Sequence, residues 1–168
     1  MGSINLVNLK SHCRWLLIRK FNWEDLPAIV DLEARSFEVG AYSVEELTDV
    51  FSNPSSFNYL AEEDGKIVGY IVAIPLDNSS ADIESIAVDP TVQRGGVGSM
   101  LMEYIEEEML ARGYSVSILE VREKNLEAIA FYQKHGYEKT KLLSNYYREH
   151  FRESRHGFRM AKRLKQNE

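Results

Sequence analysis

The chain of 168 residues is long enough for one domain with a sizeable core, and its composition, 44% hydrophobic and 27% charged, is that of an ordinary globular protein. Its 20 basic and 26 acidic residues give a formal net charge of −6, which argues against non-specific binding to nucleic acid. One cysteine, Cys13, excludes an intrachain disulfide, no apolar run approaches the roughly 18 residues that cross a membrane, and the four histidines lack metal-ligand spacing. We therefore expect a cytoplasmic protein with no metal site and no membrane contact.

The elements are predicted from apolar periodicity and from the residues that begin and end helices and turns. Residues 1–13 are expected to form a flexible arm and residues 14–168 a single domain. Asn22 and the capping box Ser43-x-x-Glu46 are each predicted to begin a helix. The other predicted elements are strands at Arg14–Phe21, Phe57–Ala61, Lys66–Leu76, Ile83–Val88, Ser115–Val121, Tyr137–Leu143 and Phe158–Leu164, a helix that begins near Val97 and ends at Arg112-Gly113, and a helix at Asn125–His135. This order predicts an α/β fold in which helices cover a mixed sheet.

A glycine-rich turn between a predicted strand and a predicted helix reads Gln93-Arg94-Gly95-Gly96-Val97-Gly98-Ser99. It lacks the Gly-Lys-Ser/Thr of a nucleoside-triphosphate loop and the third glycine of the dinucleotide fingerprint. Its glycines let the backbone approach an anion, the first N–H groups of the helix point toward that anion, and Arg94 adds a cation. The turn therefore predicts a phosphate site, and a purely structural turn is the alternative.

Three stretches around this turn point to a known family. Ile86-Ala87-Val88-Asp89-Pro90-x-x-Gln93-Arg94-x-Gly96-x-Gly98 resembles motif A of the GNAT acetyltransferases. The segment from Leu119 to Tyr137 resembles motif B in the form used by ribosomal-protein (RimI-like) and Ard1-type N-terminal acetyltransferases, and Asn145-Tyr146-Tyr147 resembles the paired tyrosines of that branch. The resemblance implies the GNAT fold, with about seven mostly antiparallel strands and about four helices. It also implies that the phosphate belongs to acetyl-CoA.

The resemblance further implies how acetyl-CoA is held. The backbone of Ile86, Ala87 and Val88 would pair with the pantetheine arm, and a bulge there would free the N–H of Ala87 or Val88 for the thioester oxygen. Asn125 would contact the cofactor, although N-capping alone explains an asparagine there. Tyr132 would protonate the departing thiolate, and a core aromatic is the alternative. The pyrophosphate would lie on Arg94, Gly95, Gly96, Val97, Gly98 and Ser99.

Glu120 is unusual because it stands in a predicted strand of mostly small or apolar residues, where a carboxylate is costly unless it is paired or functional. The resemblance implies a general base that acts through a water, and an ion pair with Arg122 is the structural alternative. A peptide α-amine has a pKa near 7.7–8.0 and lysine one near 10.4, so one carboxylate suits the α-amine better. The Ard1 group often has a histidine at the position of Asp82, and that departure places more weight on Glu120.

The sequence therefore predicts an acetyl-CoA-dependent N-acetyltransferase that acts on protein or peptide N-termini. The alternatives are a GNAT enzyme for lysine or a small amine, a non-catalytic acyl-CoA-binding domain, and a nucleotide-binding α/β protein. From Lys139 onward the chain has nine basic and three acidic residues. This excess is typical of a solvated strand edge and terminus, and docking to a ribosome is the alternative. The predicted substrate contacts are Phe37, Glu38, Tyr42, Tyr146 and Tyr147.

Overall fold

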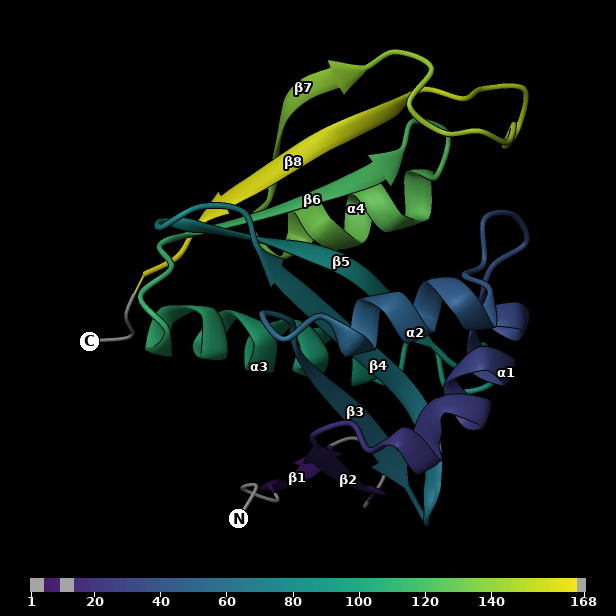
Figure 1. Cartoon of the computed structure of the whole chain (residues 1–168), viewed down its shortest axis with the longest axis vertical. Helices are drawn as coiled ribbons and strands as arrows, with labels where there is room; N and C mark the ends of the chain where they lie inside the picture. The colour runs from purple at the N-terminus through teal and green to yellow at the C-terminus, as the bar shows by residue number, and fades with distance from the viewer. Residues whose placement is uncertain (1–4, 10–13, 166–168) are drawn as a thin grey trace.

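The computed structural model describes residues 5–9 and 14–165 of the chain (Figure 1). Its elements are β1 (Asn5–Leu9), β2 (Arg14–Arg19), the 3₁₀ turn η1 (Trp23–Asp25), α1 (Leu26–Ser36), α2 (Val44–Ser52), β3 (Phe57–Glu63), β4 (Lys66–Pro75), β5 (Ser80–Val88), α3 (Val97–Ala111), β6 (Val116–Arg122), α4 (Leu126–Lys134), β7 (Glu138–Leu143) and β8 (Gly157–Arg163).

The strands of the described residues form one eight-stranded sheet in the order β1-β2-β3-β4-β5-β6-β8-β7. Every neighbouring pair is antiparallel except β5 and β6, which are parallel. The predicted α/β fold with a mixed, mostly antiparallel sheet is confirmed, and β2 to β8 correspond to the predicted strands. The additional strand β1 comes from the segment for which we expected a flexible arm, and the rest of that segment lies outside the described residues.

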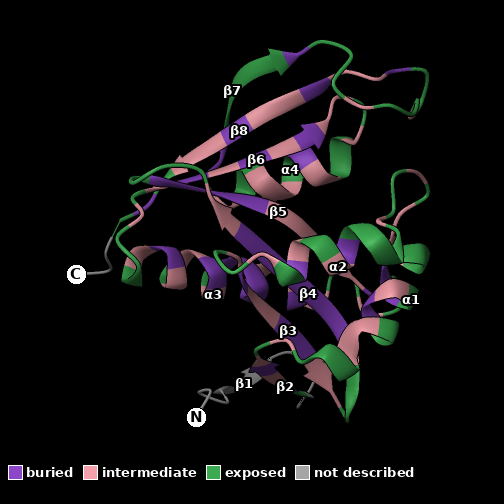
Figure 2. Ribbon diagram, in the orientation of Figure 1, coloured by how far each residue is buried: buried purple, intermediate pink, exposed green. Residues whose placement is uncertain are grey.

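Helices cover both faces of the sheet. Tyr70 and Val72 of β4 pack in one hydrophobic cluster with α1 and α2, whereas Ile71 and Ala73 belong to a second cluster with α3 and α4. Because successive side chains of a strand point to opposite faces, the two helix pairs lie on opposite sides. Figure 2 shows the buried residues concentrated in β4, in β5 and on one side of α3, while β7 is mostly exposed.

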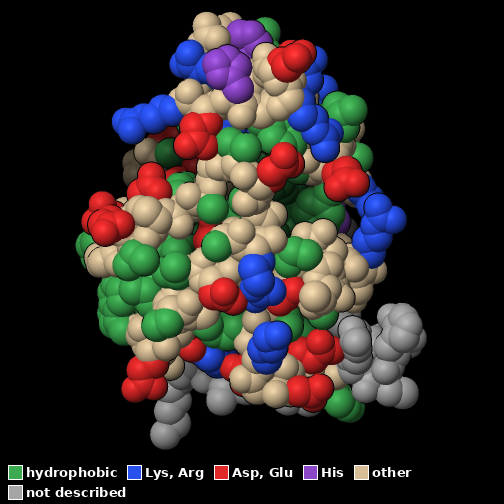
Figure 3. All heavy atoms as spheres, turned by 90° about the vertical axis from the view of Figure 1, so that its right-hand side faces the viewer, with side chains coloured by type: hydrophobic (Ala, Val, Ile, Leu, Met, Phe, Trp, Pro, Cys, Tyr) green, Lys and Arg blue, Asp and Glu red, His purple; other side chains and the backbone are tan. Residues whose placement is uncertain are grey.

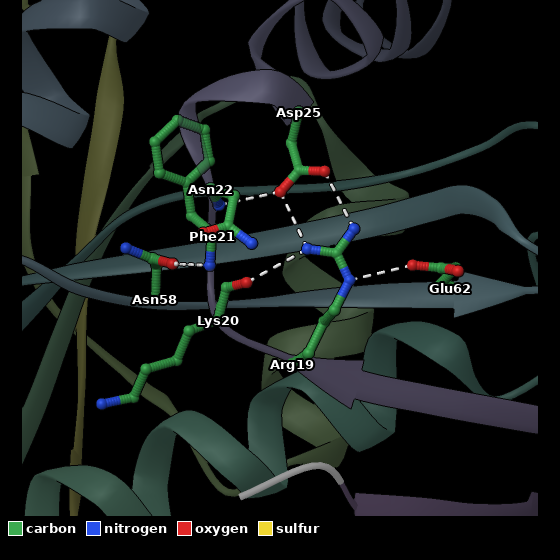
Figure 4. A network of polar contacts seen from close by, with 7 residues as sticks. All are labelled: Arg19, Lys20, Phe21, Asn22, Asp25, Asn58 and Glu62. Carbon is green, nitrogen blue, oxygen red and sulfur yellow. Dashed lines mark hydrogen bonds and ion pairs between the residues drawn. The ribbon is translucent and has the colours of Figure 1, made fainter. Parts of the chain in front are cut away.

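The helix starts are set by local polar contacts. The predicted capping box at α2 is confirmed: Glu46 donates its N–H to Ser43 Oγ (3.2 Å), and Ser43 donates its N–H to Glu46 Oε2 (2.8 Å). Asn22 begins the turn η1, and α1 starts only at Leu26. Arg19 of β2 lies between two carboxylates, Asp25 at 2.8 Å and Glu62 at 2.9 Å, and so joins the entry of α1 to β3 (Figure 4).

The sheet forks between β5 and β6. Ser80–Asp82 pair with Val116–Ile118, and the ladder ends there, so the two strands diverge over the rest of β5. Figure 1 shows β6, β8 and β7 fanning away from β5 toward the right of the view. This divergence is the feature that positions the candidate site.

A bulge in β5 orients side chains beside the fork. Pairing with β4 passes from Val72–Ser85 to Ala73–Ile83 and skips Glu84. An extra residue in one strand re-aims the side chains next to it, and here Glu84 and Ser85 both face α1 and α2. The sequence placed the bulge within Ile86–Val88, and that position is wrong. A bulge depends on the register with the neighbouring strand, which the sequence of β5 alone does not carry.

Candidate active site

The free edge of β5 runs along the open part of the fork. Asp89, directly after β5, donates its N–H to Val68 O of β4 (2.8 Å), and an antiparallel ladder alternates, so Ala87 directs its N–H to β4 as well. Ile86 and Val88 then direct their N–H groups away from β4. The carbonyl of Val88 points the same way, because it accepts from Gln93 Nε2 (3.2 Å) and Ser36 Oγ (3.3 Å). Of the two candidates for the thioester N–H, this geometry favours Val88 over Ala87.

The N-terminus of α3 lies beside this edge. The chain enters α3 through two left-handed residues, Arg94 (φ 66°) and Gly96 (φ 88°), and no side chain caps the first turn. The exposed Arg94 side chain forms no hydrogen bond or ion pair with the described residues, and the first turn contains no acidic residue. Uncapped N–H groups, the helix dipole and a free guanidinium fit an anion such as a pyrophosphate.

Two other residues of this predicted anion site also have packing roles. A Cβ at Gly98 would lie 3.3 Å from Phe131 Cζ, so glycine there permits the close approach of α3 and α4. His135 Nε2 lies 3.0 Å from Ser99 Oγ, while Nδ1 faces Phe131 O at 2.8 Å. The hydroxyl of Ser99 is therefore engaged within the protein, and its backbone N–H belongs to the uncapped turn. Gly95 and Val97 complete the segment at the start of α3.

The helix α4 supplies Asn125 and Tyr132. Asn125 caps the helix, because its Oδ1 accepts from the N–H of Ala128 (3.2 Å). Tyr132 is half-buried with its ring against Phe131, and no group of the described residues bonds its hydroxyl. Burial raises the pKa of Tyr132 to about 12, so the phenol is neutral at physiological pH. A neutral, unpaired phenol can donate a hydrogen bond to a departing group.

On the opposite face of the sheet, a cavity of about 450 Å³ opens at the fork. Figure 3 looks onto this side of the molecule, where a hollow in the upper half is rimmed by acidic and basic side chains. The carboxylates come from β5 and β6, and the aromatic groups come from two loops. The lining residues are Tyr42, Leu76, Asp82, Ile83, Glu84, Glu120, Tyr146, Tyr147 and Arg159.

Glu120 faces this cavity because β6 alternates. Leu119 and Val121 are buried in the cluster under α3 and α4, so Glu120 points to the α1 and α2 side. Its Oε1 accepts from Arg159 Nε of β8 at 3.0 Å. The alternative ion pair with Arg122 is absent: that guanidinium instead donates to Glu149 O (2.8 Å) and lies over the Tyr147 ring (4.2 Å).

Glu33, a buried residue of α1, holds the loop between α1 and α2 through hydrogen bonds. Tyr70 donates its hydroxyl to Glu33 Oε1, and Tyr42 donates its N–H to Glu33 Oε2 (3.0 Å). The Tyr42 hydroxyl then donates to Glu84 Oε1 (2.9 Å) in the cavity. Burial raises the pKa of Glu33, and the hydrogen bonds from Tyr70 and Tyr42 oppose that rise.

The other predicted residues of this loop lie elsewhere. Phe37 packs in the hydrophobic cluster of α1 and α2, and Glu38 is exposed; neither lines the cavity. The structure therefore brings together Tyr42, Tyr146 and Tyr147 and leaves Phe37 and Glu38 outside.

The tyrosine pair after β7 forms the other side of the cavity. The Tyr146 and Tyr147 rings meet edge to face with centroids 5.0 Å apart. Burial, followed by Tyr146 and the carboxylate of Glu120, raises the pKa of Tyr147, and Tyr132 adds a smaller effect in the same direction. Tyr147 therefore lines the cavity as a neutral phenol.

Sequence reasoning missed Glu84 of the cavity lining and three residues that shape the site, Glu33, Arg159 and Gly157. Glu33 resembles any polar residue of an amphipathic helix, and Arg159 is identified only once β8 is known to pair with β6. Gly157 leaves room for Tyr147, because a Cβ there would lie 2.9 Å from the Tyr147 ring and 3.1 Å from Val121 O. A glycine at the start of a predicted strand was the one available signal. Within residues 5–9 and 14–165 there is no cluster of possible metal ligands and no helix long and apolar enough to span a membrane.

A forked sheet with an open helix N-terminus on one face and a carboxylate cavity on the other defines an acyl-transfer enzyme of the acetyl-CoA type. The acetyltransferase (GNAT) family profile matches residues 18–137, so the chain belongs to this family, as the sequence predicted. The ribosomal protein bS18-alanine N-acetyltransferase of Escherichia coli is 34% identical over 125 residues, covering 73% of this chain and 81% of that protein.

Two solved structures are similar over nearly the whole chain. The ribosomal-protein-S18-alanine N-acetyltransferase from Escherichia coli superposes with a TM-score of 0.80 at 27% identity, covering 91% of this chain and 96% of that one. Ard1 from Thermoplasma volcanium superposes with a TM-score of 0.79 at 28% identity, covering 90% and 99%. The predicted relation to RimI-like and Ard1-type acetyltransferases is confirmed.

Proposed function

We propose that this acetyltransferase transfers the acetyl group of acetyl-CoA to the α-amine of a protein or peptide N-terminus. The observation that carries the proposal is the fork, where β5 and β6 separate with the uncapped start of α3 on one face of the sheet and the cavity at Glu120 on the other. Relatives named for the N-terminal alanine of a ribosomal protein and for Ard1 support the same substrate class.

Acetyl-CoA would supply an activated thioester, and the residues of the α3 and α4 face fit it. The first turn of α3 and Arg94 would hold the pyrophosphate, Asn125 would contact the cofactor, and the edge of Ile86 and Val88 would pair with the pantetheine arm. The N–H of Val88 would donate to the carbonyl oxygen and stabilise the charge that develops there.

We assign the two proton transfers of the reaction to side chains on opposite faces of the sheet. Glu120 would take a proton from the substrate ammonium through a water, and the neutral nitrogen would form its bond to the acetyl carbon as the C–S bond breaks. Tyr132 would donate its proton to the departing sulfur, and the second proton that the nitrogen loses as the amide forms would restore the phenol. At pH about 7.4 freeing an α-amine costs under about 1 kcal/mol, against roughly 4 kcal/mol for lysine, so a single carboxylate suits an N-terminus.

The test is a panel of peptides that differ in their first residue, each with a free or a blocked N-terminus and an internal lysine, incubated with acetyl-CoA and followed by mass spectrometry. We expect acetylation of free N-termini and a fall in kcat of about 100-fold or more in Glu120→Gln. The matched control is Glu138→Gln, an exposed residue of β7. Equal acetylation of blocked peptides would refute the proposal.

Ribosome docking is a finer proposal that rests on the basic segment between β7 and β8. Figure 3 shows basic, acidic and histidine side chains mixed at the top of the face that carries the cavity. Within residues 144–156 three arginines stand against Glu149 and Glu153, and this basic excess suits an acidic surface such as ribosomal RNA. Arg148 and Arg152 are the two exposed arginines of the segment. Co-sedimentation with ribosomes should fall when both are changed to Gln, and unchanged co-sedimentation would exclude this role.

A further inference from the structure

Asp82 lies at the closed end of the fork and is the last residue of β5 paired with β6. Its side chain lines the cavity, yet the residue is only 8% exposed. Among the described residues, no group donates a hydrogen bond to its Oδ1. A buried carboxylate oxygen without a partner is costly, and the proposed function gives Asp82 no part.

Every charged group that faces Asp82 is accounted for. Glu84 of β5 and Glu120 of β6 are acidic, and Glu84 is already held by Tyr42. Arg159 of β8 is the one cation among the lining residues, and it donates to Glu120. The remaining ionisable neighbours are the phenols of Tyr146 and Tyr147, and burial, followed by Glu120 and then Asp82, raises the pKa of Tyr146.

A neutral carboxyl group resolves this arrangement. Once protonated, Asp82 has an O–H that can donate to an adjacent carboxylate, and its other oxygen becomes a weaker acceptor, which costs less to leave unpaired. Burial, then Glu120 and then Glu84, raises the pKa of Asp82 far above its ordinary value of 3.8.

We propose that Asp82 acts as a protonated positioning residue that donates a hydrogen bond to Glu120 and so holds that base toward the substrate amine. The proposal rests on the function assigned above to Glu120. The protonation of Asp82 also sets the net charge of the cavity. With Asp82 neutral, two carboxylates and one guanidinium leave one net negative charge, which matches a single substrate ammonium.

Two variants of similar size separate a donor from a base. Asp82→Asn keeps a neutral donor, so kcat should stay within about threefold of the wild type. Asp82→Leu removes the donor, and kcat should fall about 10- to 100-fold with an unchanged KM for acetyl-CoA. Asp64→Asn, on the exposed β3–β4 turn, is the matched control. An Asn variant as slow as the Leu variant would show that Asp82 works ionised, and a Leu variant as fast as the wild type would show that it does not act; either result overturns the proposal.

An infrared measurement tests the proton independently of turnover. The wild-type protein at neutral pH should show the C=O stretch of a protonated carboxyl group, which Asp82→Asn should lack and Asp64→Asn should retain. Absence of that band from the wild type would overturn the proposal, whatever the activity. Failure of the wild type to acetylate any free N-terminus would instead overturn the proposed function, and the infrared result would still decide the state of Asp82.

Discussion

At the scale of single residues, burial keeps the Tyr132 hydroxyl protonated, as its proposed role of proton donor requires. Its ring contacts Phe131 and Tyr137, and burial raises the pKa of its hydroxyl to about 12. The phenol therefore keeps its proton throughout the range in which an α-amine titrates. Because none of the described residues bonds the hydroxyl, its removal leaves no protein group unsatisfied.

Tyr132→Phe should lower kcat by about 10- to 100-fold, since the departing sulfur loses its donor. The affinity for acetyl-CoA should hold, and the free energy of unfolding should change by less than about 0.5 kcal/mol. Steady-state kinetics and urea unfolding measure the two effects. Tyr114→Phe, at a tyrosine that stacks on Phe57 and lines neither the cavity nor the predicted cofactor site, is the control. Equal turnover in both variants would leave Tyr132 a packing residue.

The direction of single side chains could be predicted where a simple period governs it. Alternation along β6 places Glu120 opposite Leu119 and Val121, so one half-buried carboxylate was visible in the sequence. Its partner was not, because Arg159 lies 39 residues away and meets Glu120 only through the register of β8. The sequence offered Arg122 as the nearest cation, and long-range pairing overrides that proximity.

At the scale of elements, Arg122 joins the two loops that border the cavity. Its Nη1 donates to Glu149 O, and its guanidinium covers the Tyr147 ring on the β7–β8 side. On the other side the backbone of the α1–α2 loop comes so near that a Cβ at Gly40 would lie 2.9 Å from Nη2. One planar group therefore holds both loops at a fixed separation.

Arg122→Ala should raise the KM for peptide about three- to tenfold with little change in kcat, because the loops lose a shared contact worth about 1 kcal/mol. The KM for peptide of Arg122→Lys should lie between those of the wild type and Arg122→Ala, since lysine keeps the charge and loses the planar stack. Kinetics and amide exchange over residues 144–156 measure the effect. If exchange in that segment is as slow in Arg122→Ala as in the wild type, Arg122 does not hold the loops.

Helix starts with local signals and the strands β2 to β8 were predicted well, whereas the position of the bulge and the strand β1 were not. The capping box that begins α2 spans only the four residues Ser43 to Glu46, so the local sequence is sufficient to predict where this helix starts. The bulge at Glu84 and the strand β1 depend on neighbours in the sheet. A register between strands is specified by both partners, so the sequence of one strand leaves it open.

At the scale of the whole molecule, the fork separates two kinds of chemistry. Two hydrophobic clusters hold α1 and α2 on one face and α3 and α4 on the other, so each face is anchored by its own core. The turn predicted to bind the pyrophosphate and Tyr132 belong to the α3 and α4 face, whereas Glu120 and Asp82 line the cavity on the other face. The sheet can thus present a thioester and an amine from opposite sides of one gap.

Asp82 should lower the stability of the whole fold at neutral pH. Its pKa in the folded protein is raised above 3.8, mainly by burial and by Glu120. Below about pH 3.8 the group is protonated in both the folded and the unfolded chain and contributes nothing. As the pH rises, the unfolded chain releases this proton while the folded chain retains it, so the free energy of unfolding falls.

Asp82→Asn should therefore increase the free energy of unfolding by about 1–3 kcal/mol at pH about 7, and the gain should vanish near pH about 4. Urea unfolding of both proteins across this range measures the difference, with Asp64→Asn as the control that should show none. A gain independent of pH would mean that the amide merely packs better. A loss of stability at neutral pH would mean that Asp82 is ionised and held by favourable contacts, because only a charged group with partners stabilises the fold as the pH rises.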